Sequence, residues 1–490
     1  MIALIARLSV PAALKPKAAY TLGELCHRAG FGLRIADTDD ADIHYTDSRT
    51  HDSSAAVVIR CHAKLYDPAT VCAVHTRGGK TLWEDGALSN AETADLIGGA
   101  YRLLTLLDES QVANDARDGR GSFMVNSLPQ ARQASSAIPL VDCHADALGE
   151  AVIAVRPECA AAAAPRWPGA KRHAIVVTHD CDHVRLGAPA EIAVNTAKAI
   201  LRGSLLYARL AAIGATYMLR PSQDPFCSFA FWREWEAERG IKGAYYLFVR
   251  PPGVRVHLND CKSTARSSAL DWPLLRQMAA TGTEFGLHAP IGMRHRPEAF
   301  REAREWLEDK VGAPVVGVRH HYFALDWVCP YKSHRMHADA GFQYDSSVAF
   351  RDVPGFRSGT AMPYRAFDPV LNQEIPLTVL PCSLMDGHVL AGNGEHRPGV
   401  SGSGLIETVR EAGGATVLNW HQESAFNRLI YDGYVDALDE LLALDVARDG
   451  WMTTPRELCQ WWERRSMMLD QSDTLPSVRK RHRAAATGAA

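Results

Sequence analysis

The sequence predicts an α/β protein, a (β/α) barrel with an additional α/β domain before it. In the last two-thirds of the chain, apolar strand-like runs alternate with helix-like stretches, an order typical of βα units and a mostly parallel sheet. The 490 residues, 47% of them hydrophobic, can bury a large core and are too many for one ordinary domain. We therefore expect two domains.

The first part, residues 1–158, is expected to be an accessory α/β domain. It contains a strand-like run at 56–60 and a helix-like stretch at 92–107. No motif in it points to a particular chemistry. The alanine run that follows, with Pro165 and Gly169 after it, predicts a linker over 159–170. The tip of a helix is the alternative interpretation of those alanines.

The second part, residues 171–468, is expected to be the catalytic barrel. Residues 469–490 carry a basic cluster followed by Ala and Gly, which predicts a disordered tail. The barrel begins with the apolar run 174–177.

Two carboxylates follow that run directly, in Thr178-His179-Asp180-Cys181-Asp182. Alternation along a strand puts Asp180 and Asp182 on one face, at the strand's carboxyl end. Two carboxylates so near each other attract a cation, and a metal held by one lowers the pKa of the other. For an isolated pair, an Asp-rich turn that caps a helix is the more common explanation.

Three further strand-like runs end in histidine or arginine, and each follows a helix-like stretch. The runs are 283–288 after the helix 272–280, 315–322 after the helix 297–310, and 415–421 after the helix 405–412, with a long helical stretch on to 444. Catalytic residues of a βα barrel come from the carboxyl ends of several strands. The same pattern in four strands favours a catalytic site over capping.

On these motifs, residues 171–468 resemble the polysaccharide deacetylases of carbohydrate esterase family four, which share a deformed (β/α) barrel. The resemblance implies that Asp180 is the general base and Asp182 a metal ligand. The second motif of the family implies that His288 is another ligand. The histidine expected one helical turn later is absent, because residue 292 is glycine.

The third motif of the family corresponds to Arg319-His320-His321-Tyr322, with a histidine where the family has proline. We expect His321 to replace the missing ligand, so that Asp182, His288 and His321 hold a divalent metal, Zn²⁺ by preference, with a fourth position open. His320 and His295 are the alternatives. Strand alternation favours His321, because it shares a face with Arg319.

The last motif, Leu-x-His, corresponds to Leu418-Asn419-Trp420-His421 with one residue inserted. The resemblance makes His421 the general acid, and we expect Arg319 to orient Asp180 by a charge-assisted hydrogen bond. The aromatic residues Tyr322 and Trp420 are expected to contact the substrate, since sugar rings stack on such faces. Asp345 is expected on the substrate side, with a plain turn as the alternative.

The predicted function is a metal-dependent hydrolase that removes an N-acetyl or related acyl group from an amino sugar or polysaccharide precursor. Two alternatives remain. The same residues could act on a non-sugar, non-peptide amide, or the chain could be a catalytically silent barrel that binds carbohydrate.

Composition limits the partners and the compartment. A formal net charge of -3, from 53 basic and 56 acidic residues, gives no overall field that would recruit nucleic acid or an anionic membrane. No apolar run approaches the ~20 residues of a membrane span. Eleven cysteines without a C-x-x-C pair favour reduced thiols and a cytoplasmic location. The start of the chain is expected to be a strand, not a signal peptide.

Overall fold

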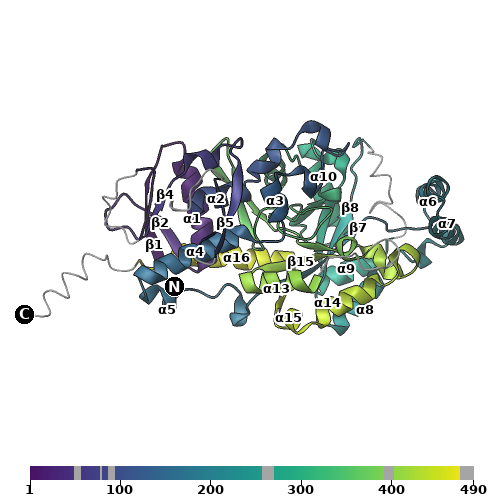
Figure 1. Ribbon diagram of the computed structural model, residues 1–490. Coiled ribbons are helices and arrows are strands. Elements are labelled where there is room, and N and C mark those ends of the chain that lie inside the picture. The colour runs from purple at the N-terminus through teal and green to yellow at the C-terminus, as the bar shows by residue number, and fades with distance from the viewer. Residues whose placement is uncertain (49–56, 78–79, 86–93, 256–269, 391–401, 475–490) are drawn as a thin grey trace, which may run out of the picture.

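The computed structural model describes residues 1–48, 57–77, 80–85, 94–255, 270–390 and 402–474. Within them the chain is a mixed α/β structure whose main sheet consists mostly of parallel strands (Figure 1). A smaller parallel sheet is built from the N-terminal part.

The N-terminal sheet has the order β2-β1-β3-β4, all parallel, and a separate antiparallel pair joins β5 to β6. The strands are β1 Ala3–Ser9, β2 Gly32–Ile35, β3 Ile43–Thr46, β4 Val57–Arg60, β5 Cys72–Arg77 and β6 Lys80–Asp85. The helices are α1 Lys15–Ala29, α2 Leu96–Leu104, α3 Gln130–Ala134, α4 Leu140–Val155 and α5 Glu158–Ala162. The expected helix 92–107 corresponds to α2, which starts where the Asp95 side chain accepts the backbone N–H groups of Ile97 and Gly98; residues 92 and 93 lie outside the described residues.

The main sheet has the order β12-β13-β11-β10-β9-β8-β7-β15-β14, with β16 also paired to β7. Its strands are β7 Ala174–Cys181, β8 Ala244–Phe248, β9 Glu284–Ala289, β10 Gly317–His320, β11 Tyr344–Asp345, β12 Tyr364–Asp368, β13 Gln373–Val379, β14 Leu384–Met385, β15 Ala415–Asn419 and β16 Trp451–Met452. All pairs are parallel except β12 with β13. Among the described residues the two ends of this path are not paired with each other, so a closed barrel stays a prediction.

Helices connect these strands. They are α6 Pro189–Arg202, α7 Leu205–Tyr217, α8 Phe229–Glu238, α9 Trp272–Ala280, α10 Pro297–Val311, α11 Pro330–Asp339, α12 Asp386–Val389, α13 Gly402–Ala412, α14 Tyr434–Ala443, α15 Asp445–Arg448 and α16 Pro455–Asp470. The central strands β7, β8 and β9 are buried along their whole length. Parallel strands covered on both faces require such near-continuous apolar runs.

The long helix expected between residues 422 and 444 is interrupted. Two short 3-10 turns, Gln422–Phe426 and Leu429–Tyr431, precede α14. Asn427, Leu429 and Gly433 have φ values of 44°, 59° and 76°. An α-helix of L-residues cannot include this left-handed conformation, so the helix begins only at Tyr434.

The register of the main sheet brings the polar strand ends to one edge. His288 of β9 lies beside Arg319 of β10 on one side and Phe248 of β8 on the other. Asn419 of β15 lies beside Thr178 of β7. The carboxyl ends of β7, β9, β10 and β15 therefore surround one region.

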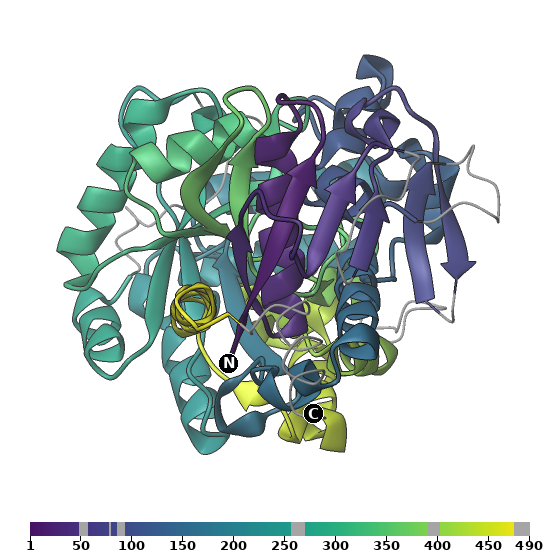
Figure 2. The same cartoon turned by 90° about the vertical axis from the view of Figure 1, so that its left-hand side faces the viewer.

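The C-terminal helix returns to the start of the chain. In Figure 2 the yellow helix α16 lies beside the purple N-terminal strands, and the Ala3 N–H donates to the Asp473 carbonyl at 3.1 Å. The residues expected to form a linker include α5 and the fully buried Trp167, whose indole N–H donates to the Gly413 carbonyl. The division into domains stays a prediction, and the expected start of the tail, residue 469, falls within α16.

In the part of the chain that the structure describes, no helix combines the length and apolar character needed to cross a bilayer.

Candidate metal centre

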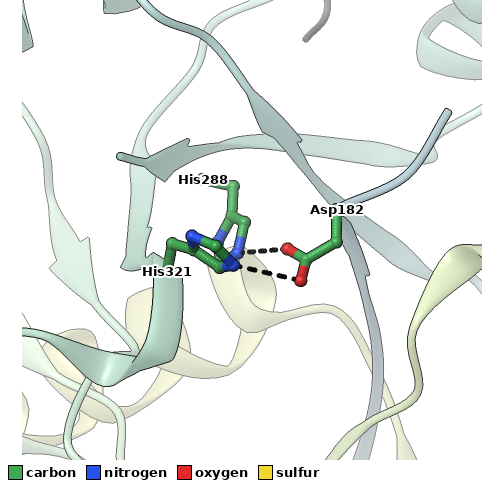
Figure 3. A group of neighbouring side chains, drawn as sticks. All are labelled: Asp182, His288 and His321. Carbon is green, nitrogen blue, oxygen red and sulfur yellow. Dashed lines mark hydrogen bonds and ion pairs between the residues drawn. The ribbon is translucent and has the colours of Figure 1, made fainter. Parts of the chain in front are cut away.

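Asp182, His288 and His321 converge at the carboxyl ends of β7, β9 and β10. The Nε2 atom of His288 lies 2.9 Å from Oδ1 of Asp182, and Nε2 of His321 lies 3.2 Å from Oδ2. Figure 3 shows both imidazole rings facing the one carboxylate. One ligand atom from each residue lies within 4.8 Å of the others, and all three residues are buried. The group is therefore a possible metal-binding site.

The donor set fits a metal such as Zn²⁺, which binds imidazole nitrogen and carboxylate oxygen. The other ring nitrogen of His288, Nδ1, lies 3.1 Å from the Arg319 carbonyl oxygen. That contact requires a proton on Nδ1 and directs Nε2 toward Asp182. Metal-binding histidines are commonly oriented by such a hydrogen bond.

A sharp turn of the backbone follows His321. Tyr322 and Phe323 both have left-handed φ values, 57° and 52°, which are costly for bulky residues. The Tyr322 ring packs on His321 with a centroid distance of 4.2 Å, and the Arg120 guanidinium lies 4.3 Å from the same ring. Tyr322 thus covers the outer side of the candidate ligand.

Position 292 cannot hold a side chain in this backbone. A Cβ atom on Gly292 would lie 2.2 Å from the Arg255 carbonyl oxygen. The histidine that the second motif lacks would therefore require a different path for the chain around Arg255.

The two alternative ligands lie away from the group. The Nε2 atom of His320 contacts Nε2 of His337 at 2.9 Å, and its ring packs on Phe300, on the opposite side of β10 from Arg319. His295 is exposed and accepts a hydrogen bond from Arg294.

Asp180 is fixed by two side chains. Its Oδ1 accepts from Arg319 at 2.9 Å and its Oδ2 accepts from the Asn419 amide at 2.8 Å. Burial opposes ionisation, but the charges of His288, Arg319 and His421 outweigh it, so the pKa of Asp180 lies below its usual value. Asp180 is therefore an ionised carboxylate beside the candidate ligands, with Oδ2 at 3.9 Å from His288 Nε2.

His421 is held by Asp386. Its Nδ1 atom lies 3.0 Å from Oδ1 of Asp386, its backbone N–H donates to Oδ2, and its Nε2 lies 4.0 Å from Oδ2 of Asp182. Burial disfavours the charged ring, but Asp386, Asp182 and Glu423 together raise the pKa of His421 well above its usual value. A protonated Nε2 therefore faces the candidate metal group, and 24% of the side chain remains exposed.

A second group, Asp182, His183 and Glu423, also brings three potential ligand atoms within 4.8 Å of one another. It shares Asp182 with the first group. Nδ1 of His183 lies 2.7 Å from Oε1 of the buried Glu191. The region around Asp182 is therefore rich in carboxylates.

The three residues expected to contact substrate differ in position. Tyr322 is partly exposed at the edge of the group. Trp420 has no exposed surface, because its ring is packed in the core and its indole N–H donates to the Tyr434 carbonyl. Asp345 is also fully buried, with Oδ2 at 2.8 Å from Nδ1 of His337. The structure thus gives Trp420 and Asp345 positions in the core rather than on a substrate surface.

Sequence reasoning gave no role to Asn419 and Asp386, which hold Asp180 and His421. Asp386 follows the short run Leu384–Met385 that forms β14. Asp180 was identified because it follows a strand-like apolar run. Asp386 also follows a strand, but a strand of two residues is too short to be recognised from the sequence.

No family model matches the chain, and no curated protein matches it. Among solved structures, a putative polysaccharide deacetylase from Mycobacterium smegmatis is 20% identical with a TM-score of 0.37, over 64% of this chain and 95% of that one. Puue allantoinase is 15% identical with a TM-score of 0.36, over 61% and 93%. A probable polysaccharide deacetylase from Pseudomonas aeruginosa PAO1 is 15% identical with a TM-score of 0.34, over 61% and 94%.

Proposed function

We propose that the chain is a metal-dependent hydrolase that removes an N-acetyl or related acyl group from an amino sugar or polysaccharide precursor. The observation that carries the proposal is the convergence of Asp182, His288 and His321 beside the side chains of Asp180 and His421. Three potential metal ligands with a base and an acid beside them are suited to hydrolysis of an amide.

In this proposal Asp182, His288 and His321 hold the divalent ion, Zn²⁺ by preference. When bound there, the ion would polarise the amide carbonyl and lower the pKa of water in the site. Arg319 and Asn419 keep the Asp180 carboxylate ionised and oriented.

The proton transfers belong to two side chains. Asp180 takes a proton from the attacking water. His421 gives its Nε2 proton to the leaving amine, while Asp386 holds the ring by Nδ1 and keeps Nε2 directed inward. The presence of both an acid and a base beside the candidate ligands favours an enzyme over a silent binding barrel. The expected cytoplasmic location remains part of the proposal.

The test combines metal analysis with acetate release. We expect about one divalent ion per chain in the wild-type protein, lost in Asp182→Ala and His321→Ala. His295→Ala removes an exposed histidine and should keep the ion. Asp180→Asn should also keep it and lose most activity.

Activity is measured on a panel of N-acetylated amino sugars, with small non-sugar amides in parallel. Hydrolysis of only the amides would replace the proposed substrate class. Absence of metal from the wild-type protein, even after reconstitution, would overturn the hydrolase assignment.

A further inference from the structure

A helical hairpin lies at the edge of the molecule, a few residues after β7 and Asp182. It consists of α6 and α7, which pack on each other and lie at the right-hand edge of Figure 1. Gly203, with a φ of 59°, forms the turn between them. The base is tied down, because the Asp224 carboxylate accepts the backbone N–H groups of Leu186 and Gly187.

The tip of this hairpin exposes large apolar side chains. Ile200 is 75% exposed, Leu201 84% and Leu205 65%, all within one turn of Gly203. By contrast, Leu210 on the same hairpin is 2% exposed and packs with Leu186 and Phe226. One exposed leucine is ordinary, but an apolar cluster that the fold leaves uncovered marks an interaction surface.

Beyond the buried Glu191 at the start of α6, the charges of the hairpin have one sign. Residues 192–223 contain four basic residues and no aspartate or glutamate, although the whole chain has more acidic than basic residues. The basic residues are Lys198, Arg202, Arg209 and Arg220. The charged ends of Lys198 and Arg202 lie 5.2 Å and 5.7 Å from the ring centroid of Tyr207. The overall charge of -3 therefore conceals a local cationic surface.

We propose that this hairpin docks on an anionic lipid surface, with Ile200, Leu201 and Leu205 inserted among the headgroups. Apolar side chains flanked by Lys, Arg and an aromatic ring are the composition of segments that lie in a membrane interface. The like charges also oppose pairing of two hairpins from two copies of the chain. The docking is interfacial, since each helix has only 13 or 14 residues and a span needs about 20.

Docking of the tip would tether the candidate metal centre to the lipid surface through the hairpin, whose helix α6 of 14 residues is about 21 Å long. The hairpin base continues from Asp182 and His183, and its contact residue Phe226 packs on Phe426 and Tyr431, in the segment after His421. Together with the proposed function, on which this step rests, the docking indicates the substrate class: an N-acylated amino sugar carried on a lipid anchor and presented at the membrane surface.

Vesicle flotation tests the docking without any use of activity. Full-length protein is mixed with vesicles of phosphatidylcholine alone or with about one-third phosphatidylglycerol. We expect binding to the anionic vesicles, weakened by salt as the Debye length shortens. The triple variant Ile200→Ser, Leu201→Ser, Leu205→Ser should bind at least about tenfold more weakly, because the inserted apolar surface is lost.

Two further variants separate charge from apolar contact. Arg202→Gln with Arg209→Gln should weaken binding to anionic vesicles by roughly fivefold for each charge removed. The control Val370→Ser with Leu371→Ser removes exposed side chains of similar size, 66% and 53% exposed, from the turn between β12 and β13. It should bind as the wild-type protein does. Circular dichroism and thermal unfolding verify that each variant is folded.

Two results would overturn the docking proposal. One is that the wild-type protein does not float with anionic vesicles, or that the triple variant floats with them as well as the wild-type protein does. The other is a wild-type dimer in light scattering that the triple variant dissociates, which would assign the tip to a second copy. The proposed function is judged separately, by acetate release from a soluble N-acetyl sugar, which the tip variants should leave unchanged.

Discussion

The buried pair between Arg319 and Asp180 allows the arrangement of the proposed base to be tested by stability alone. Arg319 has no exposed surface and donates to Asp180, Thr178 and Ser346. Replacing it with methionine keeps most of the volume and leaves the Asp180 carboxylate buried without its cation. Among the described residues, Asn419 would remain as the hydrogen-bond donor to that carboxylate.

The expected loss follows from the geometry. Two unit charges about 4 Å apart at an effective dielectric constant of ~20 interact by about 4 kcal/mol. Breaking a buried pair by removing one partner costs roughly 3–5 kcal/mol. We therefore expect Arg319→Met to lower the free energy of unfolding by about 4 kcal/mol.

The companion variant Asp180→Asn should lose less, about 2 kcal/mol, because Arg319 keeps its hydrogen bonds to Thr178 and Ser346. The double variant no longer contains an uncompensated charge. Its loss should be about 3 kcal/mol, well below the sum of the two single losses.

Urea unfolding of the four proteins, with chelator present throughout, measures the cycle. A coupling free energy of about 3 kcal/mol is expected from the values above. Losses that add to within about 0.5 kcal/mol would refute the claim that Arg319 compensates Asp180. An altered m-value in one variant would show that the substitution changed the compactness of the unfolded or folded state, in addition to stability.

Three other predictions concern separate residues. His421→Asn should lower kcat by about 10²–10⁴-fold while metal content stays the same; an unchanged kcat would remove His421 from the mechanism. Trp420→Phe should cost about 1–3 kcal/mol of stability, because the indole hydrogen bond to Tyr434 is lost and the smaller ring leaves part of the buried site unfilled, and should leave KM unchanged; a large rise in KM would place the ring at the substrate. His144 is buried and neutral, with its pKa lowered by burial to about 4, so the unfolded chain binds a proton there first as pH falls. Stability should drop by about 3 kcal/mol between pH 6.5 and pH 4 from this residue, and His144→Gln should show a correspondingly flatter dependence of urea midpoint on pH.

The strands that carry Asp180, His288 and Arg319 could be located from the sequence because they are long, apolar and end abruptly in polar residues. Strands buried on both faces must have that composition. The preference for His321 over His320 was based on strand alternation, although β10 ends at His320 and His321 begins a 3-10 turn. In the structure His321 shares Asp182 with His288, and His320 turns to the opposite side of β10.

Three other features of the structure could not be predicted from the sequence. The burial of Trp420 depends on α14, a neighbour that only the folded chain brings close. The positions of Asp386 and Asp345 depend on β14 and β11, which have two residues each. The exposed apolar tip of the α6–α7 hairpin could not be recognised either, because its sequence has the composition of an ordinary buried helix.

The contact between the two ends of the chain affects when the protein can finish folding. Strand β2 passes so close to α16 that a Cβ atom on Gly32 would lie 2.0 Å from the Leu469 carbonyl oxygen. Ribosomes add about 5–20 residues per second, so the 435 residues from 35 to 470 take roughly 20 to 90 s to make at that rate. During that time β2 is a sheet edge without its covering helix, the kind of edge that pairs with other chains. Strand β2 is therefore covered only after the residues of α16 have been synthesised, much later than the strand itself.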